Sequence, residues 1–462
     1  MFPLARALSA QMWAALGGDP ARLGRLRLQG EGALPGAFAV SDFAAAAVAC
    51  AALAADELHG LAPGTRAGDA AAVRVDRRLE ALWFAESLRP QGWQAPPARD
   101  TLTGDYPCAD GWIRLHCNAP HHRAAACRVL GLQARADSVA AAPAVAAWKG
   151  VELEQAVVEQ GGCAAQMRDA ATWSAHVQGA AVRAQPLVLR AEFPAAVAAW
   201  SPAAGRPLRG LRVLDMTRVL AGPVSTRMLA GLGATVLRID PPSWEEPGVV
   251  PDVTRGKRCA RLDLKTPQGR EAFEQLLGGA DVFVHGLRPG ALDALGLDAA
   301  TRQGLRPGLV DVCLDAYGWS GPWAARRGFD SLVQMSCGIA EAGMRHAGAS
   351  RPVPLPVQAL DHATGYLIAA AVLRALSQRV QRGVGTHARL SLARSGALLL
   401  DAPPPEPREA HAASGEADLE PAIEHTPWGP ARRIRAPWSI DGVDTRWELP
   451  AAELGSSPAR WP

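Results

Sequence analysis

Short hydrophobic runs alternate with amphipathic stretches through the middle of the chain. Segment 211–216 (LRVLDM) predicts a buried strand, and 224–232 predicts a helix that ends at Gly233. Segment 234–240 (ATVLRID) predicts a second strand, which Pro241 and Pro242 terminate. A strand, a helix and a strand within about 30 residues form a βαβ unit, in which the strands are parallel and the crossover is right-handed.

The same alternation continues along the chain. Further strands are predicted at 281–284, 309–314 and 386–392, and helices at 267–277, 292–304 and 363–376. This pattern predicts an α/β fold with an open, mostly parallel, Rossmann-like sheet and helices on both faces. The Gly-x-Gly-x-x-Gly signature is absent after the first strand, where residues 217–223 read TRVLAGP, so a dinucleotide is not the favoured ligand.

The flanking regions have a different character. Residues 101–118 predict a hairpin that turns at Asp110–Gly111, and several Ala-rich helices follow to about residue 198. Residues 401–425 are rich in Pro, Ala, Glu and His without periodicity and indicate a linker. We therefore expect a smaller α+β domain before the sheet and an extended C-terminal tail after it.

Two Ala-rich helices begin alike. Segment 40–53 (VSDFAAAAVACAAL) resembles 359–372 (ALDHATGYLIAAAV), and an extended segment follows each. This likeness has two possible explanations. One is coincidence, because Asp is a common helix cap and alanine is frequent in this chain. The other is a partial duplication, which the matching order of helix and extended segment favours and which would leave an incomplete site at Asp42. The predicted domains are 1–98 (a partial repeat of the helical half of the large domain), 99–200 (small α+β domain), 201–400 (large domain), 401–425 (linker) and 426–462 (tail).

Composition narrows the classes of function. Lys+Arg number 48 against 45 Asp+Glu, a net charge of +3, and no basic stripe with interleaved aromatics indicates nucleic-acid binding. No apolar run reaches the roughly 20 residues of a membrane span, and residues 1–16 lack a signal-peptide core, so we expect a cytoplasmic protein. The eight cysteines form no CxxC pair, and the His and Cys between 108 and 127 fit no standard ligand spacing, so we expect reduced thiols and no metal.

Several blocks, in order, resemble one known family. Residues 207–223 (PLRGLRVLDMTRVLAGP) are similar to the opening of the class III (CaiB/BaiF-type) CoA-transferases, which include formyl-CoA:oxalate and carnitine CoA-transferases and the α-methylacyl-CoA racemases. The resemblance continues through 232–242, 256–267, 288–297, 317–322 and 327–338 to the helix of Asp361. Residues 106–113 resemble the small domain of the family, which lies later in its other members. The chain therefore resembles a rearranged, partly duplicated member.

The resemblance implies that Asp361 is the catalytic aspartate. In that chemistry the carboxylate attacks a thioester to give a mixed anhydride, and the released CoA thiolate then gives an aspartyl-CoA thioester, without a metal. Taken alone, Asp361 is equally a helix cap, because Asp is a preferred capping residue.

The resemblance also implies a CoA cleft. Its expected lining is Arg218, Val219, Leu220 and Ala221, and the cations suited to CoA phosphates are Arg238, Lys257, Arg258 and Arg288. Each of these cations could equally be a solvated surface charge. Two positions depart from the family: Gly286 stands where an Asn is common, and Ala294 where an Arg is common.

The implied protein is a homodimeric enzyme that transfers CoA between an acyl-CoA and a carboxylic acid and has no permanently bound cofactor. Phe329 stands where the racemases carry a His, which argues against exchange of the α-proton. Two alternatives remain open: an acyl-CoA isomerase, dehydratase or racemase of the same family, and a non-catalytic CoA-binding homologue.

Overall fold

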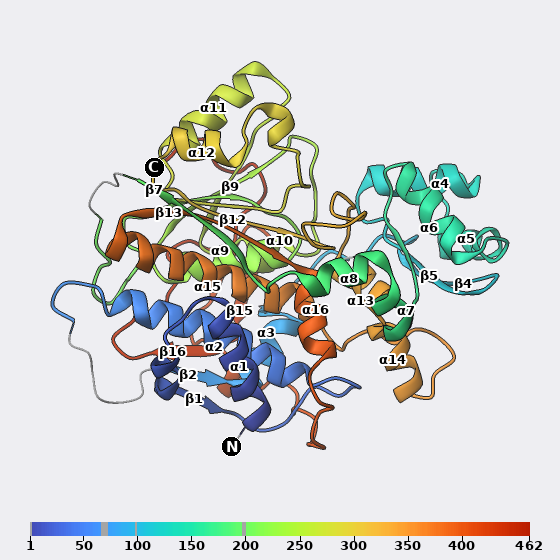
Figure 1. The fold of residues 1–462 in the computed structure, drawn as a ribbon, viewed down its shortest axis with the longest axis horizontal. Coiled ribbons are helices and arrows are strands. Elements are labelled where there is room, and N and C mark those ends of the chain that lie inside the picture. The colour runs from blue at the N-terminus through green and yellow to red at the C-terminus, as the bar shows by residue number, and fades with distance from the viewer. Residues whose placement is uncertain (1, 66–72, 98, 196–199) are drawn as a thin grey trace.

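A seven-stranded sheet forms the centre of the protein, which is seen here as a computed structural model that describes residues 2–65, 73–97, 99–195 and 200–462 (Figure 1). Its order is β10-β9-β8-β11-β12-β13-β7. The strands are β7 (Leu189–Pro194), β8 (Arg212–Met216), β9 (Thr235–Asp240), β10 (Lys257–Arg261), β11 (Val282–His285), β12 (Val310–Asp315) and β13 (Val384–Ser391). All neighbouring strands are parallel except β13 and β7. The predicted α/β sheet is confirmed.

Helices cover both faces of this sheet. They are α9 (Ala221–Gly231) and α15 (Ala359–Arg382) on one face, and α11 (Pro267–Gly278) and α12 (Ala299–Leu305) on the other (Figure 1). Successive side chains of a strand point to opposite faces, so Val213 belongs to the core beneath α9 and α15, whereas Leu214 belongs to the core beneath α11. The strands are buried on both faces because each face is covered, which explains their continuous hydrophobic runs.

Three local expectations differ from the structure. The expected helix 292–304 is divided into the 3-10 turn η2 (Asp293–Leu295) and α12, because Gly296 adopts a left-handed φ of 75°. The expected helical run to about residue 198 is interrupted, since residues Leu189–Pro194 form the edge strand β7, and positions 196–198 of that run lie outside the described residues. The other edge strand, β10, was not predicted, because its sequence KRCAR alternates charged and small residues.

The N-terminal region packs beside the sheet domain. It contains α1 (Pro3–Ala15), η1 (Pro20–Arg25), β1 (Leu26–Gln29), α2 (Val40–His59), β2 (Val73–Asp76), α3 (Arg77–Ala85) and β3 (Leu88–Pro90). Helix α2 lies against α15, and an ion pair between Glu57 and Arg374 joins the two helices (Figure 1). Asp42 and Asp361 are each the third residue of their helix, and the order α2-β2-α3 matches α15-β13-α16 (Leu392–Leu400). The partial duplication stays a prediction, to which this order adds support.

A smaller lobe has its own hydrophobic core. Its sheet, in the order β4-β5-β6, contains β4 (Gly104–Cys108), β5 (Gly111–Leu115) and β6 (Ala164–Gln166), and its helices are α4 (Pro120–Leu130), α5 (Ser138–Ala146) and α6 (Gly150–Glu159). The predicted hairpin is present, with Cys108 paired to Gly111. Helices α7 (Ala170–Ala175) and α8 (Val177–Ala184) lead back to the main sheet.

The C-terminal tail completes the N-terminal region. Its strands are β15 (Gly429–Arg433), which pairs with β3, and β16 (Trp438–Ile440), which pairs with β2. The expected linker 401–425 is not wholly irregular, because it contains η3 (Glu416–Asp418) and the start of β14 (Glu424–Thr426). The ring of Trp83 lies 5.5 Å from that of Trp438 and 5.8 Å from that of Trp447. The tail therefore shares a core with residues more than 300 positions before it in the chain.

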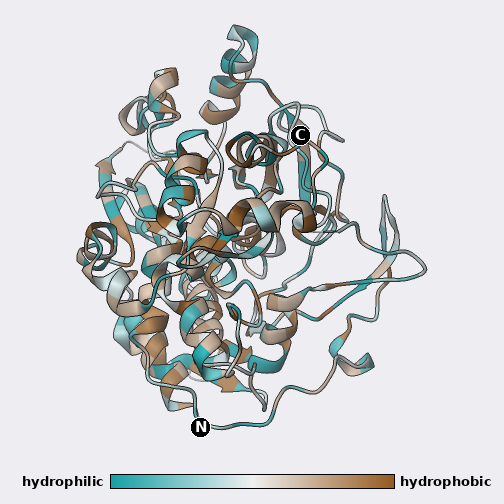
Figure 2. Ribbon diagram, turned by 90° about the vertical axis from the view of Figure 1, so that its right-hand side faces the viewer, coloured by the Kyte–Doolittle hydropathy of each residue, from teal (hydrophilic) through white to brown (hydrophobic). Residues whose placement is uncertain are grey.

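Hydrophobic residues are concentrated in the inner helices (Figure 2). Both α2 and α15 are buried on nearly every side. The remaining helices, α10 (Val250–Val253), α13 (Asp330–Cys337) and α14 (Ile339–His346), lie in connections between the larger elements. Within the described ranges, no helix combines the length and hydrophobicity that crossing a bilayer requires.

The contact between α9 and α15 gives a first prediction. A Cβ at Gly365 would lie 2.4 Å from the Ala221 backbone oxygen, so Gly365→Ala must push the helices apart. We expect the free energy of unfolding to fall by about 1–3 kcal/mol, the usual cost of overpacking. Chemical denaturation measures this change.

The matched control is Gly396→Ala in α16, where a Cβ would meet nothing closer than 3.5 Å. This variant should be neutral or stabilised by up to about 1 kcal/mol, the helix propensity gain. Equal stability of the two variants would contradict the tight contact.

Candidate functional site

The candidate site lies at the first turn of α15. Asp361 is 8% exposed and is the third residue of the helix. The N-cap position is Gln358, whose own side chain makes no capping hydrogen bond, and the side chain of Asp361 makes none either. The interpretation of Asp361 as a helix cap is therefore wrong, which leaves its carboxyl group free for another role.

Two cavities meet at Asp361. One, of about 460 Å³, lies between the main sheet and the small lobe, and the other, of about 790 Å³, is walled by the sheet domain, the small lobe and the end of α3. Val219, Phe329 and Asp361 line both cavities. A ligand in either cavity therefore approaches the same carboxyl group.

A second carboxyl group, that of Asp330, is hydrogen-bonded to the backbone of Asp361. Asp330, at the start of α13, accepts a hydrogen bond of 2.9 Å from the backbone N–H of Asp361. Burial raises the pKa of Asp361 well above its ordinary value, and the negative charge of Asp330 raises it further. Burial also raises the pKa of Asp330. Burial and the charge of Asp330 thus both disfavour ionisation of the Asp361 carboxyl group.

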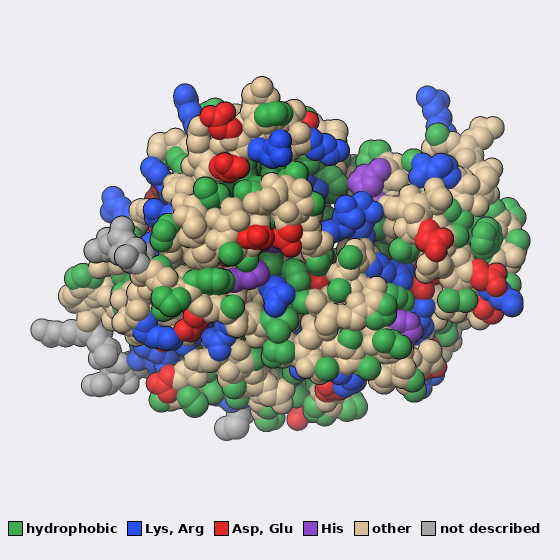
Figure 3. All heavy atoms as spheres, turned by 45° about the horizontal axis from the view of Figure 1, so that its top comes forward, with side chains coloured by type: hydrophobic (Ala, Val, Ile, Leu, Met, Phe, Trp, Pro, Cys, Tyr) green, Lys and Arg blue, Asp and Glu red, His purple; other side chains and the backbone are tan. Residues whose placement is uncertain are grey.

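The smaller cavity is strongly cationic. Its lining includes Arg218, Lys265, Arg288, Arg326 and Arg327, together with His121. The pKa of His121 is lowered by burial and then by the charges of Arg327, Arg218 and Arg288, which shows that these arginines share one positive field. Lys and Arg side chains gather on the surface where the small lobe meets the main body (Figure 3). Such a cavity is suited to a phosphate-bearing ligand.

These cations differ in their partners. Arg326 is paired with Glu154 of the small lobe, 3.1 Å away. Among the described residues, Lys265, Arg288 and Arg327 have no carboxylate within ion-pair distance, and Arg218 lies 3.8 Å from Asp240. The charges of Lys265, Arg288 and Arg327 therefore remain available to an anion.

The four residues of the expected lining come together at the two cavities. Arg218, Val219 and Ala221 line the cationic cavity, and Val219 and Leu220 line the larger one. All four belong to the turn between β8 and α9, at the carboxyl edge of the parallel sheet, where ligands of such folds bind. Arg288 also faces the cationic cavity, whereas Arg258, on the edge strand β10, lines neither cavity.

Two expected phosphate contacts are corrected by the structure. The side chains of Arg238 and Lys257 are 0% exposed. Arg238 pairs with Asp240 at 2.8 Å and with Glu246. Lys257 donates to Asp215 at 3.0 Å and to the Pro223 carbonyl at 2.9 Å. The expectation of direct phosphate contacts is therefore wrong for these two residues, which instead fix the turn beneath the cavities.

Several residues of the site were not found from the sequence. They are Lys265 and Arg327 in the cationic cavity, His121 beside them, and Phe84, Arg114, His116 and Asn118 in the wall of the larger cavity. The ring of His116 stacks on Phe329 with centroids 3.7 Å apart, and burial lowers its pKa to about 3, so it is neutral. Arg327 stands in the block 327–338 and Lys265 in the block 256–267, so both could have been chosen, whereas the others lie before the sheet domain in sequence.

Comparison with known proteins finds one family for the part of the chain that contains Asp361. Residues 208–424 match the model of CoA-transferase family III. This part of the chain belongs to that family. The family III region contains Asp361, Asp330 and the turn 217–221, while the walls contributed by residues 84–122 lie outside it.

Two relatives and one solved structure illustrate the match. A Mycobacterium tuberculosis protein named "Probable fatty acyl-CoA transferase Rv3272" is 34% identical over 40% of this chain and 50% of its own length. The succinyl-CoA:glutarate CoA-transferase of Mus musculus is 33% identical over 39% of this chain and 44% of its own. A CAIB/BAIF family protein from Brucella suis is 28% identical, with a TM-score of 0.38, over 49% of this chain and 65% of its own. The chain spans about half the length of the curated relatives that it matches.

The raised pKa of Asp361 gives a prediction for stability. A carboxyl group whose pKa is raised by folding stabilises the fold fully below its unfolded pKa, and this contribution is lost as the pH rises through the folded pKa. Asp361→Asn stays neutral, so its free energy of unfolding should exceed that of the wild type at pH 8 by at least about 1 kcal/mol and should approach it near pH 4. Denaturation at several pH values measures the difference.

The control is Asp298→Asn at the N-cap of α12. The pKa of Asp298 is lowered by the backbone N–H of Thr301, so this group shows the opposite sign. Its variant should gain no stability as the pH rises. A similar gain in both variants would show that the environment of Asp361 is not special.

Proposed function

We propose that this chain is a CoA-transferase that moves CoA between an acyl-CoA and a carboxylic acid, with Asp361 as the nucleophile. The observation that carries the proposal is the position of the Asp361 carboxyl group, which borders both a cation-lined cavity and a larger cavity. Membership of residues 208–424 in CoA-transferase family III supports the reaction class.

The proposed reaction needs only carboxylate and thioester exchange. The Asp361 carboxylate attacks the thioester carbonyl, the C–S bond breaks, and a mixed anhydride and the CoA thiolate result. The thiolate attacks the aspartyl carbonyl, which releases the donor acid and gives an aspartyl-CoA thioester. The acceptor carboxylate attacks this thioester and gives a second anhydride, and the thiolate then attacks the acceptor carbonyl to restore Asp361. No net proton is consumed, and covalent catalysis divides one difficult exchange into easier steps.

Each of the two cavities would bind a different part of the substrates. The phosphates of CoA would bind the cations of the smaller cavity, because paired charges and forked guanidinium donors suit phosphate. The acyl group and the acceptor would occupy the larger cavity, whose volume lies in the range of small-molecule sites. Burial and the neighbouring Asp330 keep the Asp361 carboxylate poorly stabilised, which favours its attack on a carbonyl.

The proposal also covers the cofactor, the cellular location and the oligomeric state of the enzyme. The reaction requires no metal or redox group, so we propose that no cofactor is permanently bound and that CoA thioesters act only as substrates. We further propose a cytoplasmic protein, as the hydropathy of the sequence indicates, and a homodimer, as the resemblance implies. Light scattering on the purified chain measures its oligomeric state.

Covalent trapping tests the nucleophile. Incubation with succinyl-CoA or acetyl-CoA followed by hydroxylamine should convert Asp361 to its hydroxamate, because both the anhydride and the aspartyl thioester are activated acyl groups. Peptide mass spectrometry locates the modification. Asp361→Asn should give none.

The matched control is Asp42→Asn, at the corresponding place in α2, where Asp42 is paired with Arg77. This variant should still be trapped at Asp361. An unmodified chain that nevertheless binds CoA would favour the non-catalytic CoA-binding alternative.

The cationic cavity gives a separate binding prediction. Arg288→Ala and Arg327→Ala should each raise the Kd of CoA by about tenfold, the typical effect of losing one charged hydrogen bond. Titration calorimetry at two salt concentrations should also show a weaker salt dependence for both variants. Arg258→Ala removes the same charge outside the cavities and should bind CoA as the wild type does; equal losses in all three variants would exclude the assigned cavity.

A further inference from the structure

Val219 has an unusual backbone conformation. Its φ of 64° makes it the only residue other than glycine with a positive φ in the part of the chain that the structure describes. A β-branched side chain strongly disfavours this left-handed region, and strained residues of this kind persist only where their surroundings hold them. Val219 also lines both cavities at Asp361. The strain therefore lies in the wall of the candidate site.

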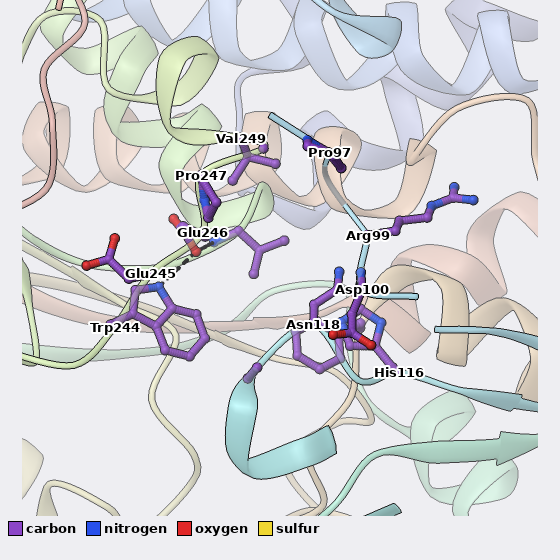
Figure 4. Close-up of a pocket in the computed structure, with 14 residues that line it drawn as sticks. Pro97, Arg99, Asp100, His116, Asn118, Trp244, Glu245, Glu246, Pro247 and Val249 are labelled. Carbon is purple, nitrogen blue, oxygen red and sulfur yellow. Dashed lines mark hydrogen bonds between the residues drawn. The ribbon is translucent and has the colours of Figure 1, made fainter. Parts of the chain in front are cut away.

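Glu246 holds this conformation. The backbone N–H of Val219 donates to Glu246 Oε2 at 2.9 Å, and the indole N–H of Trp244 donates to the same oxygen at 2.9 Å. The other oxygen, Oε1, is paired with Arg238, which β9 and Asp240 fix in place. Figure 4, a close-up of a neighbouring cavity, shows the hydrogen bond between the Trp244 indole and Glu246, while the side chain of the adjacent Glu245 points away from that cavity.

The same carboxylate also places a cation. The guanidinium of Arg218 lies 4.6 Å from the ring centroid of Trp244, and Glu246 fixes that ring by its hydrogen bond. Arg218 and Trp244 both line the cationic cavity. One buried carboxylate thus fixes the strained peptide beside Asp361 and, through the indole, the arginine of the cavity.

We propose that Glu246 is a positioning residue that holds the turn 217–221 in its strained, binding-competent conformation. Glu246 acts through Val219 and Trp244 and contacts no substrate. Without it, Val219 relaxes to a negative φ, and the turn no longer presents its backbone and Arg218 to the site. The functional consequence rests on the proposed CoA-transferase activity, whereas the conformational one does not.

A double-mutant cycle tests this role. Glycine adopts φ near +64° without strain, so it removes the need for a residue that holds the turn. Glu246→Ala should lower kcat/KM for CoA transfer from succinyl-CoA to glutarate by about tenfold or more, and should lower it by less than about threefold in the Val219→Gly background. The Kd of CoA should follow the same pattern. A merely structural role would give equal losses in both backgrounds.

The control is Glu245→Ala, which removes the same charge from a side chain that is 66% exposed and paired with Arg261. It should change kcat/KM by less than about twofold. If Glu246→Ala does not fold, Glu246→Gln takes its place, since the amide keeps the shape but cannot accept from Val219 and from Arg238 together. The same coupling with Val219→Gly is then expected.

Hydrogen exchange separates this proposal from the proposed function. The backbone N–H of Val219 should exchange about tenfold faster or more in Glu246→Ala than in the wild type, in the absence of any substrate. If the Val219 N–H exchanges faster in Glu246→Ala but the wild type shows no transferase activity, the proposed function is rejected and the positioning role of Glu246 is retained. Unchanged exchange, or equal losses across the cycle, would overturn the positioning role itself.

Discussion

The close approach of α15 to α9 is the contact on which the site depends. Gly365, one turn after Asp361, allows its helix to lie directly against the Ala221 carbonyl at the start of α9. This contact sets the nucleophile candidate beside the strained turn that bears Arg218 and Val219. Because packed interiors yield little, the distance between these two helices fixes the geometry of both cavities.

Buried charges and exposed charges have different roles around this contact. Arg238 and Lys257 are enclosed and neutralised by Asp240, Glu246 and Asp215, so they stabilise the turn from beneath. Arg288, Arg327 and Lys265 face the cavity without a carboxylate partner among the described residues, so their charge can act on a ligand. In the sequence these residues are simply Lys and Arg, and each group contains both types. Only the surroundings of each side chain in the folded protein divide them into these two groups.

Residues outside the family III region complete the site. The small lobe contributes His116 and Arg114, and the end of α3 contributes Phe84, to the wall of the larger cavity. The C-terminal tail in turn completes the sheets of the N-terminal region through β15 and β16. The order of segments expected from the resemblance is compatible with a shared cavity, because the segments meet in space.

The sequence by itself determined the α/β sheet, since each βαβ unit is a local pattern of hydrophobic runs and turns, and resemblance drew attention to Asp361. Tertiary structure alone decided which cations reach the cavities, because Arg238 and Arg288 are the same residue type and differ only in what packs around them. It also decided the pairing of β2 with β16, which joins residues far apart in the chain. Such contacts and the pKa of Asp361 depend on distances and burial that no local pattern encodes.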